Sequence, residues 1–207
     1  ALNPYSMVGN YLSAYAWGSL GDHERSLAAN ERALALLPGN ASAYYNIGVN
    51  YKELGRLEDA RKSLQRAIDL MPTAMRHHAA MAEVLLQMGR YKEALPYAEE
   101  AVRLDPRNVD AYLLVADVQS RLGNLTAAAA EMAQALRLAP TSISTLSQLA
   151  SIYFRLGNYP AAADACYGWL KADSNAVPAY LLLGASLYNQ RKYMPASAAL
   201  QKVVELQ

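Results

Sequence analysis

The stretch that decides the fold runs from Ala43 to Pro72 and reads AYYNIGVNYKELGRLEDARKSLQRAIDLMP. Apolar residues recur at helical spacing in its first half, and again between Leu57 and Ile68. Gly55 separates the two halves, where a tight turn needs a residue that adopts positive φ freely. Pro72 closes the second half, because proline cannot continue a helix. The stretch therefore predicts two helices of about 14 residues each, joined by a short turn.

The same pattern recurs along the whole chain with a period of 34 residues. Prolines, glycines and small residues each form a row at that spacing, and the rows share one register without insertion. The prolines are Pro38, Pro72, Pro106 and Pro140; the glycines are Gly21, Gly55, Gly89, Gly123 and Gly157; the small residues are Ser26, Ala60, Ala94, Ala128, Ala162 and Ala196, and Ala14, Gly48, Ala82, Ala116, Ala150 and Gly184. Small residues at such positions let two helices approach closely, because larger side chains would hold the backbones apart.

These rows predict an all-α chain built as a single array over residues 1–207. Neither helix of a repeat buries its apolar face alone, and stacking neighbours supply the missing half of the core. The repeats are expected at about 7–40, 41–74, 75–108, 109–142, 143–176 and 177–207, with residues 1–6 as the remnant of a preceding repeat. The row of prolines and asparagines also predicts that Asn40, Asn108 and Asn175 cap the helices that follow them.

The segment Ala43–Gly48, followed by Leu54-Gly55, Ala60 and Pro72, resembles a tetratricopeptide repeat almost position for position. The resemblance covers the whole chain. It implies a right-handed superhelical solenoid of six helix–turn–helix repeats, in which the first helices line a concave groove. It also implies that this groove holds an extended peptide or a helix of a partner. The chain departs from the family pattern where Asn10 replaces an apolar or aromatic residue and where Arg191 replaces the turn glycine.

Charge and composition narrow the range of partners. The 207 residues include 19 basic and 18 acidic side chains, a net charge of +1, so no electrostatic footprint for nucleic acid or an anionic membrane is present. No apolar run approaches the roughly 20 residues that a membrane span requires. The one cysteine, Cys166, excludes a disulfide framework within the chain but is compatible with either cytosol or periplasm. The compartment therefore stays undecided.

No constellation of catalytic residues stands out in the sequence. The glycines serve turns rather than a phosphate-binding loop, and no nucleophile motif is present. His77 and His78 lack a second ligand at helical spacing, so a packing role is favoured over a metal site. Cys166 shares a row with apolar residues and is expected to be a buried small hydrophobe. The sequence therefore predicts no enzyme activity, no metal and no cofactor.

The candidate binding residues follow from the groove orientation that the family resemblance implies. The second, fifth, ninth, twelfth and thirteenth residues of each first helix face the concave side, which helical spacing allows. The candidates are Tyr11, Tyr15, Tyr45, Lys52, Arg76, Glu83, Leu113, Asp117, Arg121, Phe154, Arg155, Leu181 and Tyr188. They predict an aromatic zone at the start, mixed charge in the middle and a second aromatic and aliphatic zone near the end. Aromatic and arginine side chains are the usual interface anchors, although some of the tyrosines would equally fill gaps between repeats.

Two groove chemistries of the family fit this sequence poorly. A clamp for a peptide carboxylate would use Asn46 and Arg76, but Tyr11 and Tyr15 stand where its lysine and asparagine belong. A carboxylate requires several donors to be held out of water. The asparagine ladder of glycosyltransferase arms is also absent, since that row reads Leu12, Asn46, Ala80, Leu114, Gln148 and Leu182.

The leading hypothesis is a non-catalytic adaptor or scaffold that binds a protein or peptide segment in its groove. The alternative is a substrate-recruiting arm of a larger enzyme or sensor, such as a glycosyltransferase or kinase. The last helix also suggests a further contact, because it is closed by the apolar Val203, Val204 and Leu206 without a polar cap. We expect either a longer array, or ends that a partner or a second copy covers by self-association.

Overall fold

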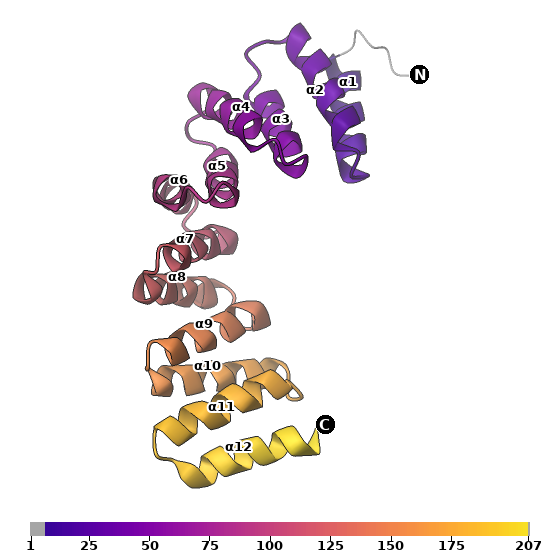
Figure 1. Cartoon of the computed structure of the whole chain (residues 1–207). Helices are drawn as coiled ribbons and strands as arrows, with labels where there is room; N and C mark the ends of the chain where they lie inside the picture. Colours follow the sequence, from indigo (N-terminus) through magenta and orange to yellow (C-terminus); the bar gives the residue numbers. More distant parts are fainter. Residues whose placement is uncertain (1–6, 207) are drawn as a thin grey trace. The chain divides into compact units, whose positions relative to one another are not determined.

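The computed structural model describes residues 7–206, which form twelve α-helices and no strand (Figure 1). The predicted remnant at residues 1–6 lies outside the described residues. The helices are α1 (Met7–Ser19), α2 (His23–Leu36), α3 (Ala41–Glu53), α4 (Leu57–Leu70), α5 (Met75–Gln87), α6 (Tyr91–Leu104), α7 (Val109–Arg121), α8 (Leu125–Leu138), α9 (Ile143–Arg155), α10 (Tyr159–Ala172), α11 (Val177–Asn189) and α12 (Tyr193–Glu205). They form six helix–turn–helix pairs, which confirms the predicted fold class.

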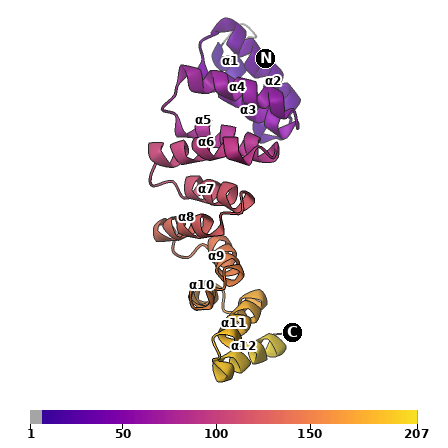
Figure 2. The same ribbon diagram turned by 60° about the vertical axis from the view of Figure 1, so that its left-hand side comes forward.

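The helices divide into two compact units, residues 1–106 and 107–207, and each unit contains three pairs. The two helices of a pair pack against each other, as both views show (Figures 1 and 2). In the first unit, α2 also packs against α3 and α4 against α5. In the second unit, α8 packs against α9 and α10 against α11. Each unit is therefore a stack of repeats in which a second helix contacts the first helix of the next repeat.

The turn inside each repeat requires a left-handed backbone. The five glycines of the turn row have φ between +72° and +84°, as the sequence predicts for residues without a Cβ. In the sixth repeat Arg191 takes this position with φ of 61°. An arginine in this region is strained, because its Cβ approaches the following carbonyl oxygen.

Side-chain caps begin several of the first helices. Asn40 accepts a hydrogen bond from the backbone N–H of Ala43, and Asn108 caps α7 in the same way. The prediction for Asn175 is wrong, because the N-cap of α11 is Ala176 and Asn175 lies in the turn before it, where its N–H donates to Asp173. Ser142 caps α9 at the position equivalent to Asn40.

The two rows of small residues meet inside each repeat. Ala94 and Ala128 of the second helices are fully buried, and so are Ala82 and Ala116 of the first helices. In the second unit these alanines belong to apolar clusters that continue from one repeat to the next. The close helix contact that the alanine rows predict is therefore present.

The helices of residues 7–206 are also informative about membranes: none of them is long and apolar enough to cross one.

Candidate binding surfaces

The aromatic candidates of the first unit have different environments. Tyr15 is 79% exposed, so its ring is open to a partner. Tyr11 is partly buried, and its hydroxyl is enclosed without a hydrogen-bond partner, which raises the pKa of this phenol. Tyr45 stacks on His77 with ring centroids 5.3 Å apart, while the Arg76 guanidinium lies 5.0 Å from the Tyr45 centroid. Tyr15 is therefore the exposed aromatic anchor, whereas Tyr45 also supports the fold.

The charged candidates of the first unit form an ion pair between repeats. The Lys52 ammonium lies 2.6 Å from the Glu83 carboxylate and 3.4 Å from that of Glu53. Burial alone would lower the pKa of Lys52, but its hydrogen bonds and charge interactions with the two glutamates raise it. The Arg76 guanidinium donates to the Ser42 hydroxyl of the preceding repeat. These side chains brace adjacent first helices, so a partner that binds them must compete with these contacts.

The second unit presents a separate set of candidates. Asp117 and Arg121 pair at 3.3 Å on the exposed face of α7, and Arg155 is exposed at the end of α9. Leu113 is half-buried against the core. Tyr188 is 63% exposed and contacts Tyr193 edge-on at 5.5 Å, with Leu181 exposed on the same helix. Phe154 is half-buried and meets Tyr159 edge-on at 5.4 Å. Tyr188 and Leu181 are therefore the most accessible apolar groups of this unit's first helices.

Each unit also contains a pocket, and the two pockets lie at the same place in the repeat. The first has a volume of about 260 Å³ between α1, α2 and α3, and the second has about 340 Å³ between α7, α8 and α9. Their lining residues correspond at a separation of three repeats. The corresponding pairs are Tyr15 and Asp117, Gly18 and Ser120, Asn30 and Met132, Asn46 and Gln148, Val49 and Ser151, and Asn50 and Ile152.

The size of the twelfth residue of each first helix explains where these pockets lie. That row reads Gly18, Lys52, Leu86, Ser120, Phe154 and Tyr188, so both pockets lie beside its two smallest members. In the second repeat the longer Lys52 reaches across to Glu83 instead. The pockets were not predicted from the sequence, because large side chains were expected at the groove positions. A small residue in this row was the available signal.

The core, rather than these surfaces, contains Cys166, His77 and His78. Cys166 is fully buried, and burial raises the pKa of its thiol to about 12. His77 and His78 are buried as well, and the His78 Nε2 lies 2.7 Å from the Pro72 carbonyl oxygen. Among the described residues, no group of three or more histidine, cysteine or carboxylate side chains is placed to hold a metal ion.

Repeated helix hairpins with a common left-handed turn define a helical-repeat protein. Two tetratricopeptide-repeat family models match the sequence, one over residues 41–74 and the other over residues 79–143. Over these residues the chain consists of tetratricopeptide repeats. A comparison with curated protein sequences finds no significant match.

Solved structures of other tetratricopeptide-repeat proteins share this fold. A MamA fragment from Desulfovibrio magneticus RS-1 has 20% identity and a TM-score of 0.76, covering 85% of this chain and 99% of its own. YrrB, described as a TPR protein with an unusual peptide-binding site, has 21% identity and a TM-score of 0.70, covering 86% and 91%. The C-terminal part of a TPR protein from Cytophaga hutchinsonii has 18% identity and a TM-score of 0.83, covering 95% and 78%. At these identities the likeness concerns the fold.

Proposed function

We propose that the chain is a non-catalytic scaffold whose first helices bind a polypeptide segment of a partner protein. One observation carries the proposal: each unit presents a pocket at the same repeat position, and the exposed Tyr15 and Tyr188 occupy first-helix positions equivalent to Asp117 and Ser120 in the lining of the second pocket. Concave sites with a few polar groups, beside aromatic anchors, are typical of peptide and ligand recognition. The description of YrrB as a peptide-binding protein agrees with this class of function.

Some of the exposed side chains would anchor the partner segment, and others would select it by charge. Tyr15 in the first unit, and Leu181 and Tyr188 in the second, supply exposed apolar area on which a partner side chain gains the most. Arg121 and Arg155 are charged and exposed, so they select partners by charge and add little affinity. With a net charge of +1, the chain has no general attraction for the phosphates of nucleic acid. We therefore expect a protein segment as the partner. We also propose that all six repeats act as one array.

The scaffold would bind by preorganisation. Helices whose caps, turns and small-residue contacts are already in place lose little conformational entropy when a partner binds. The ordering cost then lies mainly with the partner segment. A single linear segment held in this way typically binds near micromolar strength, which corresponds to about −8 kcal/mol.

A random peptide library displayed on phage and selected against the immobilised chain tests this function. We expect enriched sequences that share apolar residues at fixed spacing and bind the chain in calorimetry near the micromolar range. Selection on a variant carrying Tyr15→Ala, Leu181→Ala and Tyr188→Ala is the matched control and should enrich different sequences or none. If parent and variant enrich the same peptides with equal affinity, the partner surface lies elsewhere.

A further inference from the structure

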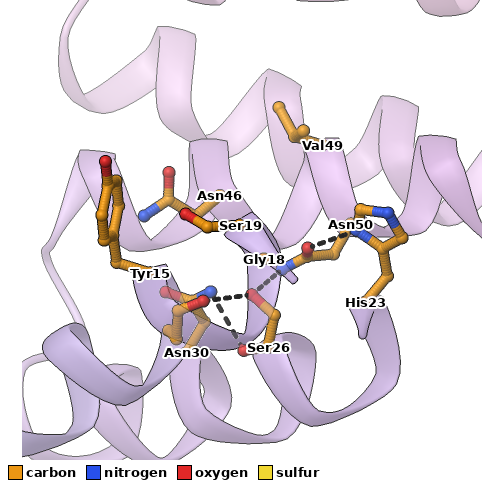
Figure 3. Close-up of a pocket in the computed structure, with 10 residues that line it drawn as sticks. Tyr15, Gly18, Ser19, His23, Ser26, Asn30, Asn46, Val49 and Asn50 are labelled. Carbon is orange, nitrogen blue, oxygen red and sulfur yellow. Dashed lines mark hydrogen bonds between the residues drawn. The ribbon is translucent and has the colours of Figure 1, made fainter. Parts of the chain in front are cut away.

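Three polar residues of the first unit occupy repeat positions that are otherwise mostly apolar. Ser26 belongs to the alanine row of the second helices. Asn30 and Asn50 stand in two further rows of aliphatic, alanine and cysteine side chains, apart from Ser186. The residues equivalent to Asn30 are Leu64, Ala98, Met132, Cys166 and Leu200, and those equivalent to Asn50 are Ala16, Val84, Val118, Ile152 and Ser186. All three polar residues are buried and line the pocket between α1, α2 and α3 (Figure 3).

These residues form one hydrogen-bonded network. The Asn50 amide donates to the Ser26 hydroxyl at 3.0 Å, and that hydroxyl donates to the Ala14 carbonyl oxygen at 2.8 Å. The Asn50 Oδ1 lies 3.3 Å from the His23 Nδ1, so the imidazole nitrogen is the donor in this contact. The amide of Asn30 donates to the Ser26 carbonyl oxygen at 3.1 Å.

One atom of this network has no partner within the described chain. The Asn30 Oδ1 is buried and accepts no hydrogen bond, although the residue is only 1% exposed. Flipping the amide would not help, because it would turn Oδ1 toward the Ser26 carbonyl, which is itself an acceptor. A buried carbonyl without a donor is destabilising, so its retention beside a pocket requires an explanation.

The pocket is neutral and of side-chain size. Carboxylates, lysines and arginines are absent from its lining, and His23 is the only titratable group there besides Tyr15. Its volume of about 260 Å³ lies below the roughly 300–1,000 Å³ of pockets that hold whole small molecules. The half-buried Asn46 also lines the pocket, and its amide hydrogen-bonds to none of the described residues (Figure 3). The lining therefore includes a buried acceptor without a donor, the Asn30 Oδ1, and an unpaired amide, that of Asn46.

We propose that this pocket binds the carboxamide of an asparagine or glutamine side chain of the partner segment. The NH₂ group of the guest donates to the Asn30 Oδ1, and its carbonyl accepts from the Asn46 amide. A carboxamide combines donor and acceptor without charge, which matches a neutral pocket better than an ammonium or carboxylate guest. This inference rests on the proposed function, because it assigns one subsite of the surface that binds the partner.

The experiment uses small probes and requires no known partner. The isotope-labelled chain is titrated with N-acetylglutamine methylamide, and the ¹⁵N–¹H spectrum is recorded at each step. N-acetylmethionine methylamide and N-acetylglutamate methylamide serve as probes of similar length. We expect saturable shifts of the Asn30, Asn46 and Asn50 side-chain amides with the glutamine probe, and at least tenfold weaker binding of the other two. The pocket floored by Met132 is an internal control that should show no such preference.

The variant Asn30→Met removes the acceptor and places in the first repeat the residue found at position 132. It should bind the glutamine probe at least tenfold more weakly and melt no lower than the parent, because it removes an unpaired buried carbonyl. If this variant does not fold, Asn30→Cys repeats the test with the residue found at position 166. Equal response to all three probes, or undiminished binding by the folded variant, overturns the inference and leaves water as the occupant.

The two proposals fail separately in these experiments. Selective binding of the glutamine probe without any enriched library peptide would remove the scaffold function but keep the pocket chemistry. Enriched peptides that bind equally after replacement of their asparagine and glutamine residues would keep the scaffold and remove the subsite.

Discussion

Gly48 and Leu64 fit together so closely that a Cβ on Gly48 would lie 2.6 Å from the Leu64 Cγ. The sixth repeat has the same pair, since a Cβ on Gly184 would lie 2.7 Å from the Leu200 Cγ. Where the repeat has alanine in place of this glycine, the residue in the place of leucine is never leucine. Those equivalent residues are Asn30, Ala98, Met132 and Cys166. The two rows therefore vary together within the chain, and the size of one residue limits the other.

This relationship predicts a coupled pair of substitutions. Gly48→Ala should destabilise the chain by about 1–3 kcal/mol, because Leu64 is fully buried and has little room to move. Leu64→Ala alone should cost about 2–5 kcal/mol through the cavity that it leaves. In the double variant, which has the alanine pair of the third repeat, Gly48→Ala should add no further loss. Urea unfolding of all four proteins gives the coupling energy. Strictly additive effects would contradict the contact.

The turn of the sixth repeat should gain stability when its left-handed residue becomes glycine. Arg191 has φ of 61°, a region that costs an L-residue roughly 1–2 kcal/mol, while glycine adds about 0.5–1 kcal/mol of chain entropy. Arg191→Gly should therefore stabilise by up to about 1 kcal/mol in thermal unfolding. The matched control is Gly123→Val at φ of 84°, which should destabilise. Effects of the opposite sign at either site would show that these turns are formed differently.

The stability of the first unit should fall in mild acid because of His77. Its imidazole is fully buried, and burial, followed by the nearby charge of Arg76, lowers the pKa of His77 in the folded state, while the backbone of Met71 and Ala67 partly opposes this shift. The unfolded chain then binds the proton more readily, so the free energy of unfolding falls as the pH drops below about 6.5. His77→Phe keeps a ring against Tyr45 and should flatten this dependence. Parallel pH profiles of parent and variant, measured by urea unfolding, would rule His77 out.

Cys166 should be unreactive in the native protein. Its thiol is fully buried with a pKa raised to about 12, so the reactive thiolate is scarce at neutral pH. A chromogenic thiol reagent should modify Cys166 rapidly only after denaturant unfolds the second unit. Fast modification under native conditions, with the far-ultraviolet dichroism unchanged, would place the thiol at the surface instead.

The sequence predicted the fold well because the decisive residues act locally. Turn glycines, helix-closing prolines and buried alanines each impose a conformation or a spacing that is visible in one repeat and recurs in the next. The candidate site was harder to predict, because exposure depends on neighbouring repeats. Lys52 was expected to be a groove residue, and in the structure it pairs with Glu83 of the next first helix. Val204 of α12 and Leu206 just after it are exposed, whereas Val203 is buried. Self-association through this end stays a prediction.

The first pocket was harder to predict, because it lies beside Gly18, which has no side chain, and sequence patterns represent a missing side chain poorly. Neither Gly18 nor Asn30 was predicted from the sequence to be a binding residue. Only the structure shows that Ser26, Asn30 and Asn50 meet in one network. A search for polar residues that interrupt an apolar row would have found all three.

The most direct test of the account measures where a peptide binds. A peptide enriched on the intact chain is titrated by calorimetry into the parent, Tyr15→Ala, Tyr188→Ala and Tyr167→Ala. Tyr167 is a matched control, because it is an exposed tyrosine on the second helix α10. The account predicts a loss of about 2 kcal/mol or more in binding free energy for Tyr15→Ala or Tyr188→Ala, and none for Tyr167→Ala. Undiminished binding by both first-helix variants would contradict it, whatever the result for Tyr167→Ala.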